Sequence, residues 1–198
     1  MSTQIVVQPV LPEAYRSAAG ALIYHAFQRK LQPLVGDPVR GPRILAAGLN
    51  LDRVLGAFDG DELVGVAGLE YAGRRVFAIK PRHCIAEFGW WRGLYTWAAI
   101  NQFTLGFYPP GQIHIAALAV NGRRRGQGIG SILLEAVFDL ARHQNLRAVR
   151  LEVVDTNQGA QQLYERFGFT VIHRFPLPFL RNWLGFSAVN EMIKKLAR

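Results

Sequence analysis

Three arginines and three alternating glycines precede an apolar helical pattern in NGRRRGQGIGSILLEA, residues 121–136. Glycine in regular structure costs roughly 0.5–1 kcal/mol relative to alanine, so the segment needs a compensating role. A loop that leads from a strand into a helix exposes unpaired backbone N–H groups and the positive end of the helix dipole. Glycines also let the backbone approach phosphate oxygens closely. The stretch therefore predicts a site for a phosphate or pyrophosphate.

Two ligand classes compete for this loop, a dinucleotide and coenzyme A. A dinucleotide fingerprint, G-x-G-x-x-G, would be completed by an acidic residue about 20 residues further on, where Glu152 lies on a predicted strand. That fingerprint also requires a glycine at position 131, where Ser131 stands. A P-loop is excluded because no Gly-Lys-Ser/Thr follows the glycines.

The elements around the loop form a β–loop–α–β pattern. Residues 113–120 and 148–155 predict buried strands, and 129–144 predicts an amphipathic helix between them. Such a unit implies two neighbouring parallel strands joined by a right-handed crossover. Further strands are predicted over 4–10, within a hairpin over 53–73, and over 169–175 and 187–196, with helices over 12–27, 42–50 and 157–167. Interleaved helices and hairpins predict an α/β (α+β) fold on a mixed sheet.

An aromatic-rich segment, residues 74–112, separates the hairpin from the strand before the loop. It contains Trp90, Trp91 and Trp97, followed by the helix-breaking pair Pro109-Pro110. A helix that packs aromatics onto the core is the favoured interpretation. A substrate-pocket wall or the contact of a homodimer is the alternative, because aromatic residues are enriched in both.

Composition bounds the function. The 198 residues are 50% hydrophobic and 19% charged, which favours a single globular domain over 1–198. The single cysteine, Cys84, and the lack of a signal-peptide pattern lead us to expect a cytoplasmic protein. The net charge of +9 favours an anionic partner. Because no nucleic-acid motif and no membrane-spanning run is found, we expect neither nucleic acid nor membrane as the partner.

A family resemblance selects coenzyme A. The residues Arg125-Gly126-Gln127-Gly128-Ile129-Gly130 match the R/Q-x-x-G-x-G/A loop of the GCN5-related N-acetyltransferases, the GNAT superfamily. The segment LEVVDTNQGAQQLYERFGF, residues 151–169, resembles the family's LEV…N…A…LYE…GF pattern. The resemblance is strong over 113–175, weaker over 4–73 and absent over 74–112. Gly122 departs from it, because a proline is common there. It implies a mainly antiparallel sheet with a central splayed parallel pair.

The resemblance also implies which residues bind acetyl-CoA as co-substrate, with no metal. Backbone groups before the loop would pair with the pantetheine arm, and backbone N–H groups of the loop would hold the pyrophosphate. Asn157 would hydrogen-bond the arm, although an N-cap of the following helix is as good an interpretation. The full set is Leu118, Ala119, Val120, Arg125, Gly126, Gln127, Gly128, Ile129, Gly130, Ser131, Asn157 and Tyr164. Arg123 and Arg124 either contact the phosphates of CoA or lie in solvent.

Tyr164 matches the family's tyrosine that faces the thioester sulfur. A phenol of pKa about 10 is suited to protonate a departing thiolate. The alternative is that Tyr164 only packs on an amphipathic helix.

An amine nucleophile needs a base, because an amine of pKa about 10.4 is neutral only about one part in a thousand at pH 7. The resemblance offers His114, at a position where several members place a base, and Glu152, which matches the base of enzymes that acetylate ribosomal-protein N-termini. We favour His114 slightly. His173 is interpreted as structural, and Cys84 lacks a paired base for an acyl-enzyme.

The sequence therefore predicts direct acetyl transfer to a primary amine of a small molecule or a protein N-terminus. Polyamine, arylalkylamine, antibiotic, amino acid and peptide acceptors all stay open. A non-catalytic CoA-binding sensor of the same fold and a basic nucleic-acid-binding module are the rival hypotheses.

Overall fold

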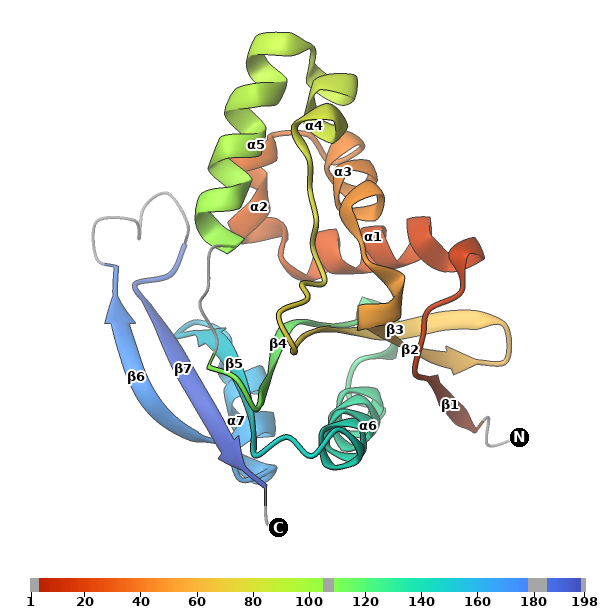
Figure 1. Cartoon of the computed structure of the whole chain (residues 1–198), viewed down its shortest axis with the longest axis vertical. Helices are drawn as coiled ribbons and strands as arrows, with labels where there is room; N and C mark the ends of the chain where they lie inside the picture. The colour runs from red at the N-terminus through yellow and green to blue at the C-terminus, as the bar shows by residue number, and fades with distance from the viewer. Residues whose placement is uncertain (1–3, 105–108, 178–184, 197–198) are drawn as a thin grey trace.

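A seven-stranded sheet forms the centre of the computed structural model, which describes residues 4–104, 109–177 and 185–196. Its strands lie in the order β1-β2-β3-β4-β5-β7-β6 (Figure 1). They span Ile5–Gln8 (β1), Val54–Asp59 (β2), Glu62–Glu70 (β3), Gln112–Val120 (β4), Ala148–Val154 (β5), Thr170–Pro176 (β6) and Ala188–Lys195 (β7). Every neighbouring pair is antiparallel except β4 and β5. The mixed, mainly antiparallel sheet with a central parallel pair is thus confirmed.

The parallel pair separates halfway along its length. β4 and β5 pair only from Gln112 to Ile115 on the first strand and from Ala148 to Leu151 on the second. Immediately beyond, the register of β4 against β3 skips Ala116, and such a bulge bends and twists the strand that carries it. The remainders of β4 and β5 then run on without pairing to each other, which leaves two backbone edges facing an open split. The predicted splay is confirmed.

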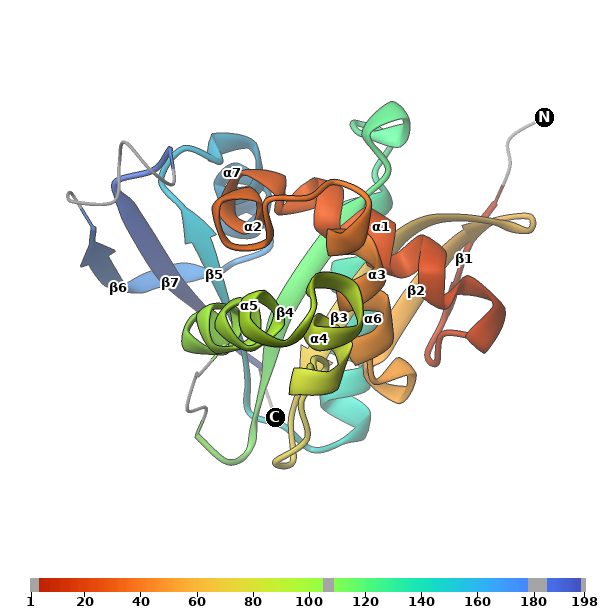
Figure 2. The same cartoon turned by 90° about the horizontal axis from the view of Figure 1, so that it is seen from above.

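Helices cover both faces of the sheet. α6 (Ile129–His143) and α7 (Gln158–Arg166) lie on one face, and the other carries α1 (Arg16–Ala26), α2 (Gln28–Val35), α3 (Arg40–Gly48), α4 (Pro81–Phe88) and α5 (Trp90–Thr104). Figure 2 shows α1 crossing over β3 and β4, and it is in contact with both strands. We call these the α6/α7 face and the α1–α5 face.

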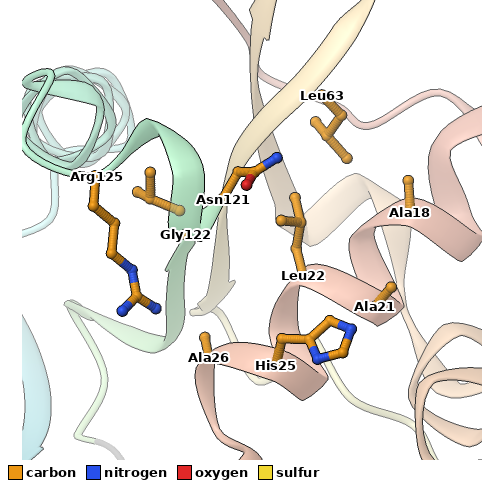
Figure 3. A pocket seen from close by; sticks show the side chains of 10 residues that line it. Ala18, Ala21, Leu22, His25, Ala26, Leu63, Asn121, Gly122 and Arg125 are labelled. Atoms are coloured by element: carbon orange, nitrogen blue, oxygen red, sulfur yellow. The ribbon is translucent and has the colours of Figure 1, made fainter. Parts of the chain in front are cut away.

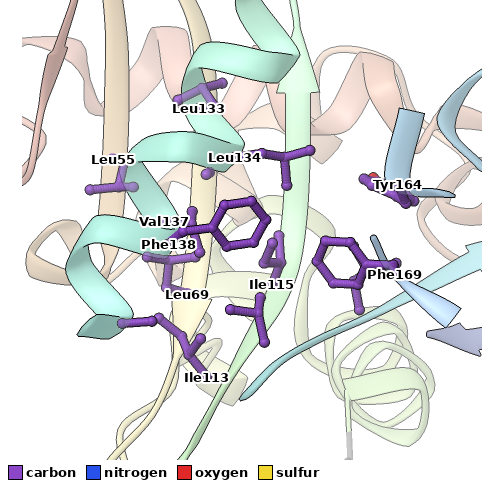
Figure 4. Packing of buried hydrophobic residues seen from close by; sticks show 14 of the residues in the cluster. Leu55, Leu69, Ile113, Ile115, Leu133, Leu134, Val137, Phe138, Tyr164 and Phe169 are labelled. Carbon is purple, nitrogen blue, oxygen red and sulfur yellow. The ribbon is translucent and has the colours of Figure 1, made fainter. Parts of the chain in front are cut away.

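Each face has its own hydrophobic core. On the α6/α7 face, α6 buries Leu133, Leu134, Val137 and Phe138, whose spacing is that of one helical stripe (Figure 4). They join Ile113 and Ile115 of β4 and apolar residues of β3 and β5 in one cluster. On the α1–α5 face, the buried residues of α1, α3 and α5 cluster with residues of β2, β3 and β4. Because α6 is packed into the core of the α6/α7 face, the glycine loop that precedes it is anchored at its helix end.

The aromatic-rich segment 74–112 joins β3 to β4 and forms two helices where one was predicted. The chain turns between α4 and α5 at Gly89, whose φ of 78° is a conformation that glycine adopts readily. Trp97 is half-buried against the core and donates a hydrogen bond from Nε1 to the Ile79 carbonyl at 3.0 Å. Trp90 and Trp91 are 64% and 81% exposed. The core-packing interpretation therefore holds for Trp97 alone among these three tryptophans.

The N-terminal helical region also differs from the predicted single helix over 12–27. A 3-10 turn over Glu13–Tyr15 leads into α1, and a further helix, α2, follows and ends at the left-handed Gly36. The sequence pattern missed α2 because Pro33 lies inside it and proline disfavours helix interiors. Within the described residues, no helix is both long enough and apolar enough to span a membrane.

Candidate active site

The glycine loop has a backbone conformation that only glycine adopts freely. Gly126 and Gly128 have φ values of 78° and 79°, and Gly128 is the N-cap from which α6 begins. A Cβ at either position would meet nothing within 4 Å, so the requirement is the left-handed φ rather than space. Gly130, inside the first turn of α6, approaches Leu163 of α7 so closely that a Cβ would lie 3.2 Å from its Cδ2. The glycines thus shape an open helix N-terminus.

The strand side of the loop is fixed by polar contacts. A 3-10 turn over Gly122–Arg124 follows β4, and the Asn121 side chain accepts a hydrogen bond from the Arg123 backbone N–H at 3.1 Å. The Arg124 guanidinium forms an ion pair with Asp59 at the end of β2. Arg124 therefore holds the loop against the β2–β3 hairpin, a contact that the sequence interpretations of this arginine did not include.

A cavity of about 530 Å³ lies between α1 and the loop. Its walls include Val120 and Arg125, two of the predicted cofactor residues, and His25 of α1 (Figure 3). Arg125 and His25 lie on facing walls, and alanines of α1 supply much of the remaining lining. The cavity thus joins the loop to the α1–α5 face.

The open edge of β4 offers alternate backbone groups to the split. The Asn121 backbone N–H bonds to the Val64 carbonyl of β3 at 2.9 Å, which fixes the alternation of the strand. Ala119 then turns its N–H and C=O groups toward β3, whereas Leu118 and Val120 turn theirs toward the split. Of the three backbone positions predicted to meet a pantetheine arm, Leu118 and Val120 therefore direct their backbone groups into the split, and Ala119 does not.

Two acidic side chains and one histidine gather on the α1–α5 face, where the split begins. His114 comes from β4, Glu152 from β5 and Glu70 from the end of β3. The His114 Nδ1 lies 3.9 Å from the Glu70 Oε2, and both side chains are buried, whereas Glu152 is exposed. Burial raises the pKa of the Glu70 carboxyl, and the charge of Glu152 adds to this; Arg75 and the Val76 backbone N–H act in the opposite direction. The structure thus brings the two predicted bases to one face.

Tyr164 lies on the opposite face. Its ring is buried in the α6/α7 core beside Phe169, with ring centroids 5.8 Å apart (Figure 4). Burial raises the pKa of the Tyr164 hydroxyl to about 12, so the phenol is protonated throughout the neutral range. Its contacts fit the packing interpretation, and its protonated hydroxyl can act as a hydrogen-bond donor.

The remaining predicted residues have clear local roles. Asn157 is the N-cap of α7, and its side chain accepts a hydrogen bond from the Ala160 backbone N–H at 3.3 Å. Burial raises the pKa of the Cys84 thiol to about 11, which makes it a poor nucleophile at neutral pH. His173 is exposed and stacks near Phe175 on β6. Neither Cys84 nor His173 lies in the group formed by Glu70, His114 and Glu152.

Sequence reasoning missed one member of this group and one neighbour. Glu70 is the last residue of an otherwise apolar strand interior, and only the register of β3 against β4 places it opposite His114. Arg150 of β5 donates hydrogen bonds to Gln112 of β4 and to Glu191 of β7. These contacts join three strands, so no single segment reveals them.

The split parallel pair and the glycine loop together match the fold of the GCN5-related N-acetyltransferase class. The family model described as the Acetyltransferase (GNAT) family matches residues 22–169. The chain belongs to this family.

Known proteins agree with that assignment. Mycothiol acetyltransferase from Acidimicrobium ferrooxidans is 41% identical over 63 residues, which are 32% of this chain and 20% of that protein. This chain spans only 20–37% of the length of the curated relatives that it matches.

Solved structures share the fold. A GCN5-related N-acetyltransferase from Kribbella flavida has a TM-score of 0.58 at 20% identity, with 97% of this chain and 98% of that chain covered. A Bacillus subtilis acetyltransferase in complex with CoA has a TM-score of 0.51 at 17% identity, covering 74% of this chain and 80% of that chain.

Proposed function

We propose that the protein transfers the acetyl group of acetyl-CoA directly to a primary amine of a small molecule or a protein N-terminus. The observation that carries this proposal is the split between β4 and β5, which opens beside the glycine loop and has a histidine and a carboxylate at its origin. Family membership supports acetyl transfer. The identity of the acceptor as an amine is proposed from the site.

The residues around the split fit acetyl-CoA. The left-handed Gly126 and Gly128 leave the N-terminus of α6 open, and a pyrophosphate is a natural ligand of such an end. The backbone groups of Leu118 and Val120 face the split, where they would pair with the amides of a pantetheine arm. When bound, acetyl-CoA supplies a thioester as the acetyl donor. Residues 125–131 would hold its pyrophosphate, and the arm would run along the open edge of β4.

The two faces then supply different parts of the chemistry, proton removal from the amine and stabilisation of the leaving sulfur. On the α1–α5 face, His114 or Glu152 takes a proton from the incoming amine, because only the neutral amine is nucleophilic. On the α6/α7 face, the Tyr164 hydroxyl donates a hydrogen bond to the departing sulfur. With a pKa of about 12, Tyr164 is a weaker acid than an ordinary phenol, so this hydrogen bond is its main contribution to stabilising the thiolate.

An acceptor screen tests the proposal. Acetyl-CoA consumption is measured with polyamines, arylalkylamines, aminoglycoside antibiotics, amino acids and peptides with free N-termini. Turnover with at least one class, and transfer of the acetyl group to nitrogen shown by mass spectrometry, is the expected result. Binding of acetyl-CoA without turnover on any class would favour the CoA-binding sensor instead.

A further inference from the structure

Glu70 is a buried carboxylate that the proposed reaction does not yet use. It ends β3, a strand whose other residues after Glu62 are apolar or glycine, and only 8% of it is exposed. Burying an ionised carboxylate is costly unless hydrogen bonds or opposite charges compensate. A leucine would pack at such a position without that cost. The presence of a carboxylate therefore indicates a role other than packing.

Its surroundings come from three segments. The Val76 backbone N–H donates to Glu70 and Arg75 lies within electrostatic range, both from the segment that follows β3. From β4, His114 presents Nδ1 at 3.9 Å from the Glu70 Oε2. From β5, Glu152 adds a like charge.

The other charged groups nearby are engaged elsewhere or remote. Arg150 of β5 is bonded to Gln112 and Glu191. Helix α5 carries a single charged residue, Arg92, which is exposed in its first turn and stacks over Phe88. His114 and Glu152 are therefore the titratable side chains next to Glu70, and of the two only His114 becomes positively charged when it takes a proton.

We propose that Glu70 is a positioning residue for His114: its carboxylate faces Nδ1, fixes the imidazole, and stabilises the imidazolium that forms when Nε2 takes the proton of the acceptor amine. This inference rests on the proposed function. The proton leaves the amine nitrogen for Nε2, Nδ1 keeps its own proton, and Glu70 stays ionised. Because 3.9 Å exceeds hydrogen-bond length, the pair closes by about 1 Å when the charge develops. The carboxylate also sets which ring nitrogen acts as the base.

The pH dependence of stability reports the ionisation of Glu70. The pKa of the Glu70 carboxyl is raised in the folded protein, so its contribution to stability is present below the unfolded pKa and is lost as pH rises through the folded pKa. At neutral pH the ionised carboxylate costs stability. Glu70→Gln keeps an acceptor for the Val76 N–H, and we expect it to be at least as stable as the wild type at pH 7. Because glutamine has nearly the same shape as glutamate, a variant that is less stable at every pH would mean that the carboxylate makes a structural hydrogen bond or ion pair instead.

The test is an NMR titration of the His114 imidazole in the full chain, which needs no acceptor. Glu70→Gln should lower the pKa of His114 by about one unit, and Glu70→Asp, which keeps the charge, should restore part of the shift. Glu62→Gln is the matched control, because Glu62 lies on the same strand with its side chain exposed, and it should leave the pKa unchanged. In the wild type, the carboxyl carbon of Glu70 should report the His114 titration, a measurement that needs no variant.

Activity supplies the second readout once an acceptor is known. The ascending limb of the kcat/KM profile should move to lower pH in Glu70→Gln, with kcat reduced about tenfold and acetyl-CoA affinity unchanged. An unchanged His114 pKa in Glu70→Gln, or a limb that does not move, would overturn the inference. Failure of the proposed function is recognised separately, because the wild type would then acetylate no amine while the titration still decides the pairing.

Discussion

The two faces of the sheet build their parts of the candidate site in different ways. On the α6/α7 face, the loop residues 125–131 are contiguous, and a helix N-terminus and two left-handed glycines determine what they can bind. On the α1–α5 face, Glu70, His114 and Glu152 come from three strands and meet only through the register of the sheet. The proposed cofactor half is thus a local motif, whereas the proposed acceptor half is a product of tertiary structure.

The largest expected effect comes from replacing the general base, for which His114 and Glu152 are the two candidates on the α1–α5 face. We expect His114→Gln to lower kcat/KM about 10²–10⁴-fold, because a general base is lost. It should also remove the ascending limb near neutral pH from the pH profile of kcat/KM. Glu152→Gln should act mainly on the KM of the acceptor. His173→Gln is the control, since His173 is exposed on β6. If Glu152→Gln removes the limb and His114→Gln does not, the assignment is reversed.

Tyr164 tests whether the α6/α7 face takes part in chemistry as well as binding. Tyr164→Phe removes only the hydroxyl, so the contact with Phe169 is kept and acetyl-CoA affinity should change little. Loss of the hydrogen bond to the leaving sulfur should lower turnover about 10–10⁴-fold when chemistry is rate-limiting. Unaltered turnover under those conditions would reduce Tyr164 to a packing residue.

The glycine loop gives a smaller and purely local effect. Gly128→Val forces a β-branched residue into a φ of 79°, and strain of about 1–3 kcal/mol should weaken acetyl-CoA about 10–100-fold. Gly122→Ala is the matched control in the same loop, because a Cβ there meets nothing within 4 Å and no left-handed φ is required. Calorimetric titration measures both. Equal affinities in the two variants would mean that the loop conformation does not matter for binding.

Two tryptophans of the aromatic-rich segment test stability rather than binding. Trp97→Ala removes a half-buried ring and its hydrogen bond to Ile79, and we expect a loss of about 2–4 kcal/mol in the free energy of unfolding. Trp91→Ala, at an 81% exposed position, should change it by less than about 0.5 kcal/mol. Light scattering of both variants shows whether this helix pair forms a subunit contact. A Trp91→Ala variant that alters the oligomer would support the homodimer hypothesis.

What the sequence predicted follows the same division between the faces. The β–loop–α–β unit and the glycine loop are encoded in neighbouring residues, so their periodicity and motif spacing sufficed. The sequence did not indicate Glu70 as a site residue, because an acidic residue at a strand end is ordinarily solvent-exposed. Only the pairing of β3 with β4 places it against His114. Helix α2 was not predicted from the sequence, because the local propensity around Pro33 disfavours a helix. The separation of Tyr164 and His114 onto opposite faces likewise needs the sheet itself.

Acetyl-CoA binding at the split is the central claim, and thermal unfolding with added ligand tests it most directly. At a hundredfold excess over its dissociation constant, acetyl-CoA should stabilise the wild type by about 2.7 kcal/mol. NAD at the same concentration should give no shift, and the acetyl-CoA shift should shrink in Gly128→Val but not in Gly122→Ala. A shift with NAD alone would contradict the account.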